Sequence, residues 1–276
     1  MHKPVSQISS HSFRQAFPGL MGIDIMAHAY PIEPILVFTE YHMNQAVFGP
    51  HPHAGISVMT YMLPDSEQGF INRDSLGDMS YIEPGGLHIT QAGSGMFHDE
   101  FPRVAGIDTH GFQIWFNHAE SQRWVEPKSM HAAAVEVPQK VGEGYRVRVL
   151  HGSFEEVQGL HELVVAINLL HIELEAGQKL ELPAQEMAFV YTLAGDGRVN
   201  DQAVTAHQLV NFTEAGNRVS LQAGDSTLAL MFATATPTRE PIVYGGPFVM
   251  TTQAQMKATQ ERLQAGGMGY LGKYKG

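Results

Sequence analysis

Closely spaced turn signals constrain the fold of this chain more than any other feature of its sequence. Between residues 64 and 95 such signals recur roughly every 8–12 residues, with short apolar segments between them. They are Pro64-Asp65-Ser66, Asp74-Ser75-Leu76-Gly77-Asp78, Glu83-Pro84-Gly85-Gly86 and Gln91-Ala92-Gly93-Ser94-Gly95. The segment before them, Ile56–Leu63, is rich in β-branched and aromatic residues, as buried strands are. This pattern predicts an all-β fold of antiparallel barrels or sandwiches.

The second half of the chain repeats this scheme at an offset of about 131 residues, close to half of the 276 residues. The matching segments are Phe189–Leu193 with Met59–Leu63, and Gly216–Gly224 with Gly85–Gly93, the last pair ending in the same Gln-Ala-Gly. The repeat predicts two antiparallel β-barrel domains, which we place at residues 1–138 and 139–276.

One helix is predicted, near the C-terminal end. Gln253–Gln264 contains neither Gly nor Pro, and Gly266-Gly267 can stop a helix. Thr252 can cap its first turn, and Gln255 stands three residues later, as a capping box requires. A short C-terminal α-helix is therefore expected after the strands.

Composition excludes several classes of function. The net charge of −11 disfavours direct binding to nucleic acid, because phosphate contacts need clustered Lys and Arg. The absence of Cys rules out disulfides, thiolate metal sites and a Cys nucleophile. No stretch approaches the roughly 20 apolar residues of a membrane span, and Met1–Gln7 lacks the apolar run of a signal peptide. We expect a cytoplasmic protein that binds no membrane.

Two short motifs suggest a metal site. His51 and His53 flank Pro52, and residues at i and i+2 of an extended segment project to the same face. His98 and Glu100 share this spacing about 45 residues later. Three imidazoles and one carboxylate form a nitrogen-and-oxygen donor set that suits Fe(II), Cu(II), Ni(II), Mn(II) or Zn(II). The predicted metal ligands are therefore His51, His53, His98 and Glu100.

Other residues near these motifs are not predicted to bind the metal. Asp99 faces away from the predicted site in this geometry, so we expect it behind the ligands or on the surface. Phe48, Met96 and Phe97 are candidate walls of a pocket, although a place in the ordinary core is as reasonable for each. The other twelve histidines have no such partners and are expected to be structural; of these, His42 and His88 are the nearest to the site in sequence or along its strands.

These motifs resemble the pirin family of the cupin superfamily. The resemblance covers nearly the whole chain and rests on several ordered elements. They are His51-Pro52-His53-Ala54-Gly55, Asp74-Ser75-Leu76-Gly77, Pro84-Gly85, Ala92-Gly93-Ser94-Gly95, His98-Asp99-Glu100, Gln113-Ile114-Trp115-Phe116-Asn117, Glu240-Pro241-Ile242-Val243 and Gly246-Pro247-Phe248-Val249-Met250.

The resemblance implies two cupin (jelly-roll) domains with metal only in the first. The sequence agrees, because the second-half counterpart of the His-x-His segment is Glu181–Gln185, which has no His. We place the counterpart of His98–Glu100 near Ala229–Met231, which also lacks ligands. The implied cofactor is one divalent transition metal, with Fe(II) favoured and Ni, Cu, Mn, Co or Zn as alternatives.

Two functions are implied by the resemblance. The first is metal-dependent dioxygenase activity of the quercetin 2,3-dioxygenase type, in which O2 opens the ring of a flavonol or related enol. The metal would bind the enolate oxygen as a Lewis acid, and Glu100 would be a ligand that also takes the enol proton as catalytic base. The alternative is a metal-containing regulatory or binding protein that acts through a protein partner. A monomer is slightly favoured.

The chain departs from the family pattern at several places. Ala54 replaces the usual Arg, Leu87–Thr90 replaces a common Leu-Gln-Trp-Met-Thr, and Pro34–Phe38 lacks the usual Asp-Pro-Phe opening. These differences affect the expected lining of the pocket, and hence the substrate, more than the metal ligands.

Overall fold

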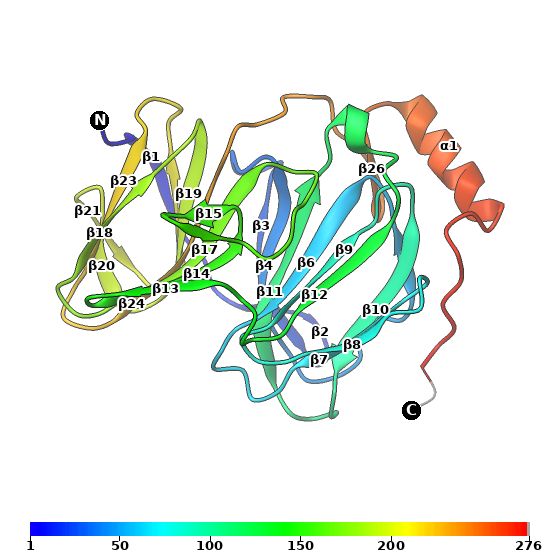
Figure 1. Ribbon diagram of the computed structural model, residues 1–276, viewed down its shortest axis with the longest axis horizontal. Helices are drawn as coiled ribbons and strands as arrows, with labels where there is room; N and C mark the ends of the chain where they lie inside the picture. Colours follow the sequence, from blue (N-terminus) through cyan, green and yellow to red (C-terminus); the bar gives the residue numbers. More distant parts are fainter. Residues whose placement is uncertain (275–276) are drawn as a thin grey trace.

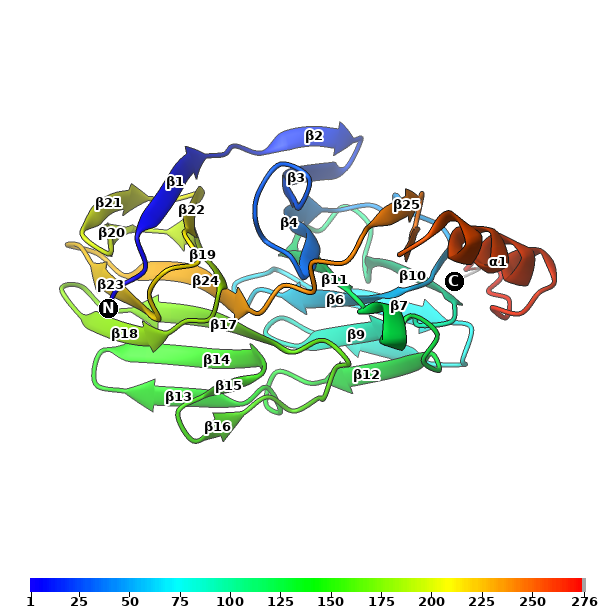
Figure 2. The same ribbon diagram turned by 90° about the horizontal axis from the view of Figure 1, so that it is seen from above.

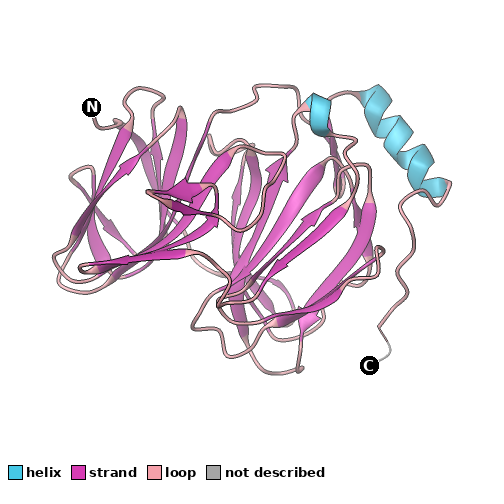
Figure 3. Ribbon diagram, viewed as in Figure 1, coloured by secondary structure: helices cyan, strands magenta, loops and turns pink. Residues whose placement is uncertain are grey.

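The computed structural model describes residues 1–274, and strands dominate them (Figure 1; Figure 3). The predicted all-β fold is confirmed. Each half of the molecule contains one seven-stranded and one four-stranded antiparallel sheet, as expected for a jelly-roll of the cupin type. Within this part of the chain no helix has the length and apolar character needed to cross a bilayer.

The first half contains the sheets that carry the His-x-His and His-x-Glu motifs. In order across its larger sheet the strands are β12 (Lys128–Ala132), β9 (Leu87–Gln91), β6 (Ile56–Met62), β11 (Thr109–Asn117), β4 (Ile35–Met43), β3 (Leu20–Met26) and β2 (Arg14–Phe17). The smaller sheet has β5 (His51–His53), β10 (Met96–Pro102), β7 (Phe70–Asp74) and β8 (Met79–Ile82).

The second half repeats this arrangement strand for strand. Its larger sheet has β1 (Val5–Ser10), β22 (Gln208–Phe212), β19 (Met187–Ala194), β24 (Leu228–Ala235), β17 (Ile167–Leu174), β14 (Tyr145–His151) and β13 (Gln139–Gly142). Its smaller sheet has β18 (Lys179–Pro183), β23 (Arg218–Ala223), β20 (Asp196–Val199) and β21 (Gln202–Thr205). Two hairpins, β15 (Ser153–Phe154) with β16 (Val157–Gln158) and β25 (Val243–Gly245) with β26 (Phe248–Met250), lie outside these sheets, as does the 3-10 turn η1 (Glu120–Gln122).

The topology confirms one predicted internal match and corrects two others. β6 and β19 occupy the same central position, as the likeness of Met59–Leu63 to Phe189–Leu193 predicted. However, β9 corresponds to β22 in the larger sheet, whereas Gly216–Gly224 contains β23 of the smaller sheet. The two segments that share Gln-Ala-Gly are therefore not structurally equivalent. The counterpart of β10 is β23, and the predicted counterpart Ala229–Met231 lies instead on β24, which matches β11.

The two larger sheets pack against each other through the largest apolar cluster of the molecule. Phe38 on β4 lies at this junction, with ring centroids 5.3 Å from Phe189 and 5.6 Å from Tyr191 on β19. Burial of so many large side chains from both halves is strongly stabilising, at roughly 1.5–3 kcal/mol for each fully buried large apolar side chain. The halves therefore share a core as well as having interiors of their own.

Each end of the chain contributes to the opposite half of the molecule. β1 is an edge strand of the second half's larger sheet, where it pairs with β22 (Figure 2). The hairpin β25–β26 returns to the first half, where Phe248 forms a bridge with Ala54 and packs on it. The division into domains at residue 138 stays a prediction. The N-terminal strand and the C-terminal hairpin each pack in the half on the other side of that division.

The predicted C-terminal helix is confirmed as α1 (Gln253–Gln264), drawn in red in Figure 1. Its capping box is complete: the hydroxyl of Thr252 accepts from the backbone N–H of Gln255, and the Gln255 side chain accepts from the backbone N–H of Thr252. Met256 from α1 joins Ala54 and Phe248 in a small apolar cluster. The helix therefore packs on the β25–β26 hairpin, next to the residue that follows His53.

Candidate metal centre

Two neighbouring strands of the smaller sheet bring the three predicted histidine ligands together. β5 and β10 run antiparallel, with His51 paired to His98 and His53 paired to Met96. Because side chains alternate along a strand, His51 and His53 share one face, and the paired His98 meets them there. Spacing and register thus give a three-imidazole cluster at the wall of the first half's interior.

The three imidazoles converge closely enough to hold one ion. Their ring centroids lie 4.9 Å apart for His51 and His53, 4.7 Å for His51 and His98, and 4.9 Å for His53 and His98. One ligand nitrogen from each lies within 4.8 Å of the other two. With metal–nitrogen bonds of about 2.0–2.1 Å, three such atoms can bind a single cation.

Hydrogen bonds orient all three rings through Nδ1. The Nδ1 of His51 lies 2.9 Å from the carbonyl oxygen of Gly49, and that of His53 lies 3.1 Å from the carbonyl of Pro247. A carbonyl oxygen only accepts, so Nδ1 carries the proton in both rings. The lone pair of each Nε2 is then free to bind a metal ion. The Nδ1 of His98 contacts Thr90 Oγ1 at 3.3 Å, while its buried Nε2 has no hydrogen-bond partner.

This pattern is the one that metal-binding histidines show. Protein-bound imidazole ligands commonly use the second ring nitrogen in a hydrogen bond that fixes the tautomer and the ring orientation. An orphaned, buried imidazole nitrogen is otherwise unfavourable, and a cation would satisfy it. The residues present therefore fit a divalent metal, as the chemistry of the donor set suggested.

Burial keeps the ligand imidazoles in the neutral form that metal binding needs. It lowers the pKa of His53 to about 3, with the neighbouring His51 adding to the effect and the Pro247 hydrogen bond opposing it. Burial also lowers the pKa of His98 well below its usual value, and His53 and His51 lower it further. Protons therefore compete weakly with metal at these two positions near neutral pH.

Glu100 lies at the cavity beside the imidazoles, but outside the group of three close ligand atoms. Its Oε2 accepts from Thr60 Oγ1 at 2.6 Å and from Gln113 Nε2 at 3.2 Å. Burial raises the pKa of Glu100 to about 7, although both hydrogen bonds oppose the rise. A carboxyl group with such a pKa can gain or lose a proton near neutral pH.

A cavity of about 400 Å³ opens on this cluster, with His51, His53 and Glu100 in its lining. Its other walls are mainly apolar and aromatic, a composition typical of small-molecule sites. They are Ala16, Phe17, Leu20, Asp24, Thr39, Tyr41, Met43, Phe48, Phe70, Gln113, Trp115 and Pro247. The arrangement can thus hold an aromatic molecule beside three imidazoles and one carboxyl group.

Of the three residues predicted as pocket walls, the structure places one at the cavity and two away from it. Phe48 lines the cavity as predicted, whereas Met96 is fully buried elsewhere and Phe97 packs on the cluster around Ala54. These two are therefore no pocket walls. Asp99 points away from the site but is not on the surface, since it is 2% exposed and forms an ion pair with Arg73.

The smaller sheet of the second half has apolar side chains where the first half has ligands. On β18, Leu182 is buried, and on β23 Val219, Leu221 and Ala223 are buried in the same apolar core. Among residues 1–274, both groups of side chains that could hold a metal lie in the first half. That the second domain holds no metal stays a prediction.

Several residues that complete the centre were not singled out as site residues in the sequence. Gln113 and Trp115 belong to the Gln-x-Trp-x-Asn element, and Pro247 to the C-terminal signature, but neither motif revealed its contact in advance. The C-terminal signature acts on the centre because β26 returns to β5, which brings the Pro247 carbonyl to His53. Thr60 and Thr90 carry no sequence signal of their own.

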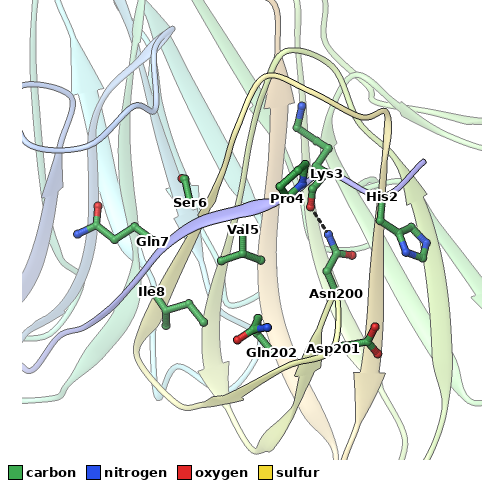
Figure 4. A pocket seen from close by; sticks show the side chains of 10 residues that line it. All are labelled: His2, Lys3, Pro4, Val5, Ser6, Gln7, Ile8, Asn200, Asp201 and Gln202. Carbon is green, nitrogen blue, oxygen red and sulfur yellow. Dashed lines mark hydrogen bonds between the residues drawn. The ribbon is translucent and has the colours of Figure 1, made fainter.

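A second large cavity, of about 530 Å³, lies in the second half of the molecule, beside β1 (Figure 4). β1 and the loop at Asn200–Gln202 line it, and Asn200 Nδ2 donates to the carbonyl of Lys3 at 2.7 Å. The Lys3 ammonium donates to four backbone carbonyls and is therefore unavailable to a ligand. None of the predicted site residues lines this cavity.

Fold and site together define a two-domain cupin-type protein with a histidine-rich centre in its first domain. Sequence comparison agrees: the pirin family matches residues 18–116, and the pirin C-terminal cupin domain matches residues 169–269. The pirin-like protein At1g50590 of Arabidopsis thaliana is 34% identical over 242 residues, which cover 82% of this chain and 77% of the relative. The chain belongs to the pirin family.

Solved structures show the same fold. The crystal structure of quercetin 2,3-dioxygenase from Acinetobacter baumannii superposes with a TM-score of 0.85 at 22% identity, covering 98% of this chain and 99% of that one. The bacterial pirin YhhW from Escherichia coli, solved in complex with nickel(II), gives a TM-score of 0.65 at 18% identity, covering 84% and 100%. At these identities the likeness establishes the fold alone.

Proposed function

We propose that the protein is a metal-dependent dioxygenase of the quercetin 2,3-dioxygenase type, which opens the ring of a flavonol or related enol substrate. One observation carries the proposal: His51, His53 and a buried carboxyl group with a pKa near 7 line one largely apolar cavity, and His98 stands beside the two imidazoles in the same cluster. The family and the fold shared with a protein named quercetin 2,3-dioxygenase support it.

His51, His53 and His98 would hold the metal through Nε2, because Nδ1 of each is engaged elsewhere. Fe(II) is our first choice; Ni, Cu, Mn, Co and Zn suit the same donors. When bound, such an ion supplies Lewis-acid activation of the enol oxygen and a means of engaging O2. Glu100 is proposed as a fourth ligand as well, in line with its His-x-Glu spacing to His98.

Glu100 is also the proposed catalytic base. The hydrogen bonds from Thr60 and Gln113 both reach Oε2, which leaves Oε1 for the substrate or the metal. Since its pKa lies near 7, a fraction of the molecules has the carboxylate ready to accept the enol proton at neutral pH. Thr60 and Gln113 then keep that carboxylate in one orientation while it accepts the proton.

The cavity favours a flat aromatic substrate. Trp115 lies with its ring centroid 4.9 Å from that of His53, and Phe17 meets Phe48 edge to face at 5.7 Å near the opening. Both phenylalanines are about half exposed, at 50% and 44%, as side chains at a mouth would be. Aromatic walls bind planar rings well and exclude water from the reacting atoms.

Turnover of quercetin under O2 tests the proposal directly. We expect Fe(II)-loaded protein to consume quercetin and O2, Glu100→Gln to lower kcat by about 10²–10⁴-fold, and His98→Ala to abolish activity together with metal binding. Glu143→Gln, at an exposed carboxyl group on the second domain, is the matched control and should leave the rate unchanged. Equal rates for wild type and both site variants would refute the enzyme proposal.

A further inference from the structure

A second cluster of potential ligands lies inside the first domain. Asp74 at the end of β7, Asp78 in the turn before β8 and His88 on β9 each offer one ligand atom within 4.8 Å of the others. β7 belongs to the smaller sheet and β9 to the larger one, so the cluster joins the two sheets across the interior. Asp74 is 3% exposed and His88 1% exposed, whereas Asp78 is half-buried.

Among the described residues, neither carboxylate forms an ion pair with Lys, Arg or His. None of the ion pairs within 4.0 Å includes Asp74 or Asp78. Arg73, their neighbour in sequence, pairs instead with Asp99 on the opposite face of the sheet. Two carboxylates this close together and largely shielded from water repel each other, so a nearby positive charge would stabilise them strongly.

Hydrogen bonds fix both carboxylates in place. Asp74 Oδ1 accepts from the backbone N–H groups of Leu76 at 2.8 Å and of Asp78 at 3.1 Å, and its Oδ2 accepts from Ser129 Oγ. Asp78 Oδ2 accepts from Asn72 Nδ2 at 3.0 Å and from Ser80 Oγ at 2.9 Å. Ligand atoms held in this way are already ordered before a cation binds.

Two further polar atoms at the cluster lack any partner. Asn72 Oδ1 and His88 Nε2 are both buried without a hydrogen bond. Asn72 is tied to Asp78 directly, and His88 is tied to it through Ser80, whose Oγ lies 3.3 Å from His88 Nδ1. Acceptors therefore outnumber donors at this point of the interior, which is the imbalance that a bound cation corrects.

We propose that Asp74, Asp78 and His88 form a second divalent-cation site, with the Asn72 amide oxygen beside it. Two carboxylates, one imidazole and one amide oxygen suit Mn²⁺ or Zn²⁺. The ion would clamp the smaller sheet to the larger one behind the three-histidine centre. The sites are neighbours, because Thr90 contacts His98 while its cross-strand partner Ser129 contacts Asp74.

Manganese binding to a variant with the first centre disabled tests this site without any activity assay. His51→Ala/His53→Ala protein is stripped with a chelator, reloaded with Mn²⁺, desalted and analysed for metal. We expect about one Mn²⁺ per chain for this variant and about two for the wild type. Adding Asp78→Asn should remove the remaining ion, whereas Asp225→Asn, at an exposed carboxyl group of the second domain, should not.

No bound Mn²⁺ in the His51→Ala/His53→Ala protein would overturn the proposal, and so would retention of that ion after Asp78→Asn. If the Asp78→Asn chain fails to fold, crystals of Mn²⁺-loaded wild type decide by anomalous scattering. A peak among Asp74, Asp78 and His88 is expected, and a peak at the three histidines alone would contradict it. Quercetin turnover plays no part in these measurements, so the dioxygenase proposal stands or falls separately.

Discussion

His98 depends on contacts that its motif does not reveal. Thr90 Oγ1 holds its Nδ1 at 3.3 Å, and Nε2 is left without a partner in the interior. The i, i+2 spacing predicts that His51 and His53 share a face, whereas the approach of His98 depends on the pairing of β5 with β10, which the spacing does not reveal. Thr60, Thr90 and Gln113 could not be predicted, since their roles follow from how the two sheets face each other.

Thr90→Val should weaken metal binding while preserving the shape of the side chain. Loss of the hydroxyl leaves the His98 ring less well oriented, and comparable contacts behind metal ligands contribute about 10–100-fold in affinity. Competition with a chromophoric chelator measures the change in Kd. Thr213→Val, at an exposed position, is the control, and an unchanged affinity in Thr90→Val would show that the hydroxyl does not position the ring.

Glu100 makes the metal-free protein less stable as pH rises. Because its pKa is about 7 in the folded state against 4.5 for an unperturbed glutamate, the folded chain binds the extra proton between these values. The stability contributed by the protonated carboxyl group is complete below about pH 4.5 and is lost as pH rises through about 7. The difference is on the order of 3 kcal/mol.

Urea unfolding of chelator-treated wild type and Glu100→Gln between pH 4.5 and 8 measures this effect. The variant cannot ionise at this position. As pH rises, the wild type should therefore lose stability relative to the variant, as measured by the free energy of unfolding. His53 and His98 are present in both proteins and cancel in the comparison. Parallel pH profiles would mean that Glu100 titrates normally despite its burial.

At the scale of elements, the His-x-His strand depends on a close approach of the C-terminal hairpin. Gly55 has φ +76°, and a Cβ there would lie 1.9 Å from the carbonyl oxygen of Val249. Only glycine allows both the left-handed backbone and this contact. The same approach brings the Pro247 carbonyl to His53, so the element that closes the fold also orients a ligand.

Gly55→Ala should therefore destabilise the protein more than an equivalent change elsewhere. Gly177 has nearly the same φ, +74°, but open space around it, so Gly177→Ala measures the cost of the backbone alone, about 1–2 kcal/mol. The collision with Val249 should add about 1–3 kcal/mol in Gly55→Ala. Thermal unfolding compares the two, and an equal loss of stability would mean that the hairpin adjusts freely.

Element types were more predictable than their equivalence between halves. α1 follows from its caps and from the absence of Gly and Pro, which are local signals. The Gln-Ala-Gly repeat was misleading because short β segments look alike in any sheet, and β9 and β23 belong to different ones. Pairing partners are set by contacts far apart in sequence, which a single sequence does not encode locally.

At the scale of the whole molecule, the halves are not independent. β1 completes the sheet of the second half, and the shared apolar cluster joins the two larger sheets. The crossing of the chain ends could not be predicted from the repeat, because Val5–Ser10 has no sequence feature that assigns it to β22. Lys3 secures this strand through its four carbonyl contacts.

A chain of residues 139–276 alone should consequently fail to form a soluble monomer. It would expose the edge of β22 and the face that Phe38 covers, and both are sites for aggregation. Sedimentation and thermal unfolding measure the outcome. Co-expression with residues 1–138, which supply β1, should restore a soluble complex, whereas a cooperative monomer formed by 139–276 alone would contradict this expectation.

X-ray absorption at the iron edge of protein loaded with one equivalent of Fe(II) tests the central claim most directly. The three-histidine centre predicts about three imidazole nitrogens at bonding distance in the wild type, with characteristic multiple scattering from the rings. The spectrum should lose this signature in His51→Ala/His53→Ala. An iron site without imidazole scattering in the wild type, or one that the double variant leaves unchanged, would contradict the account.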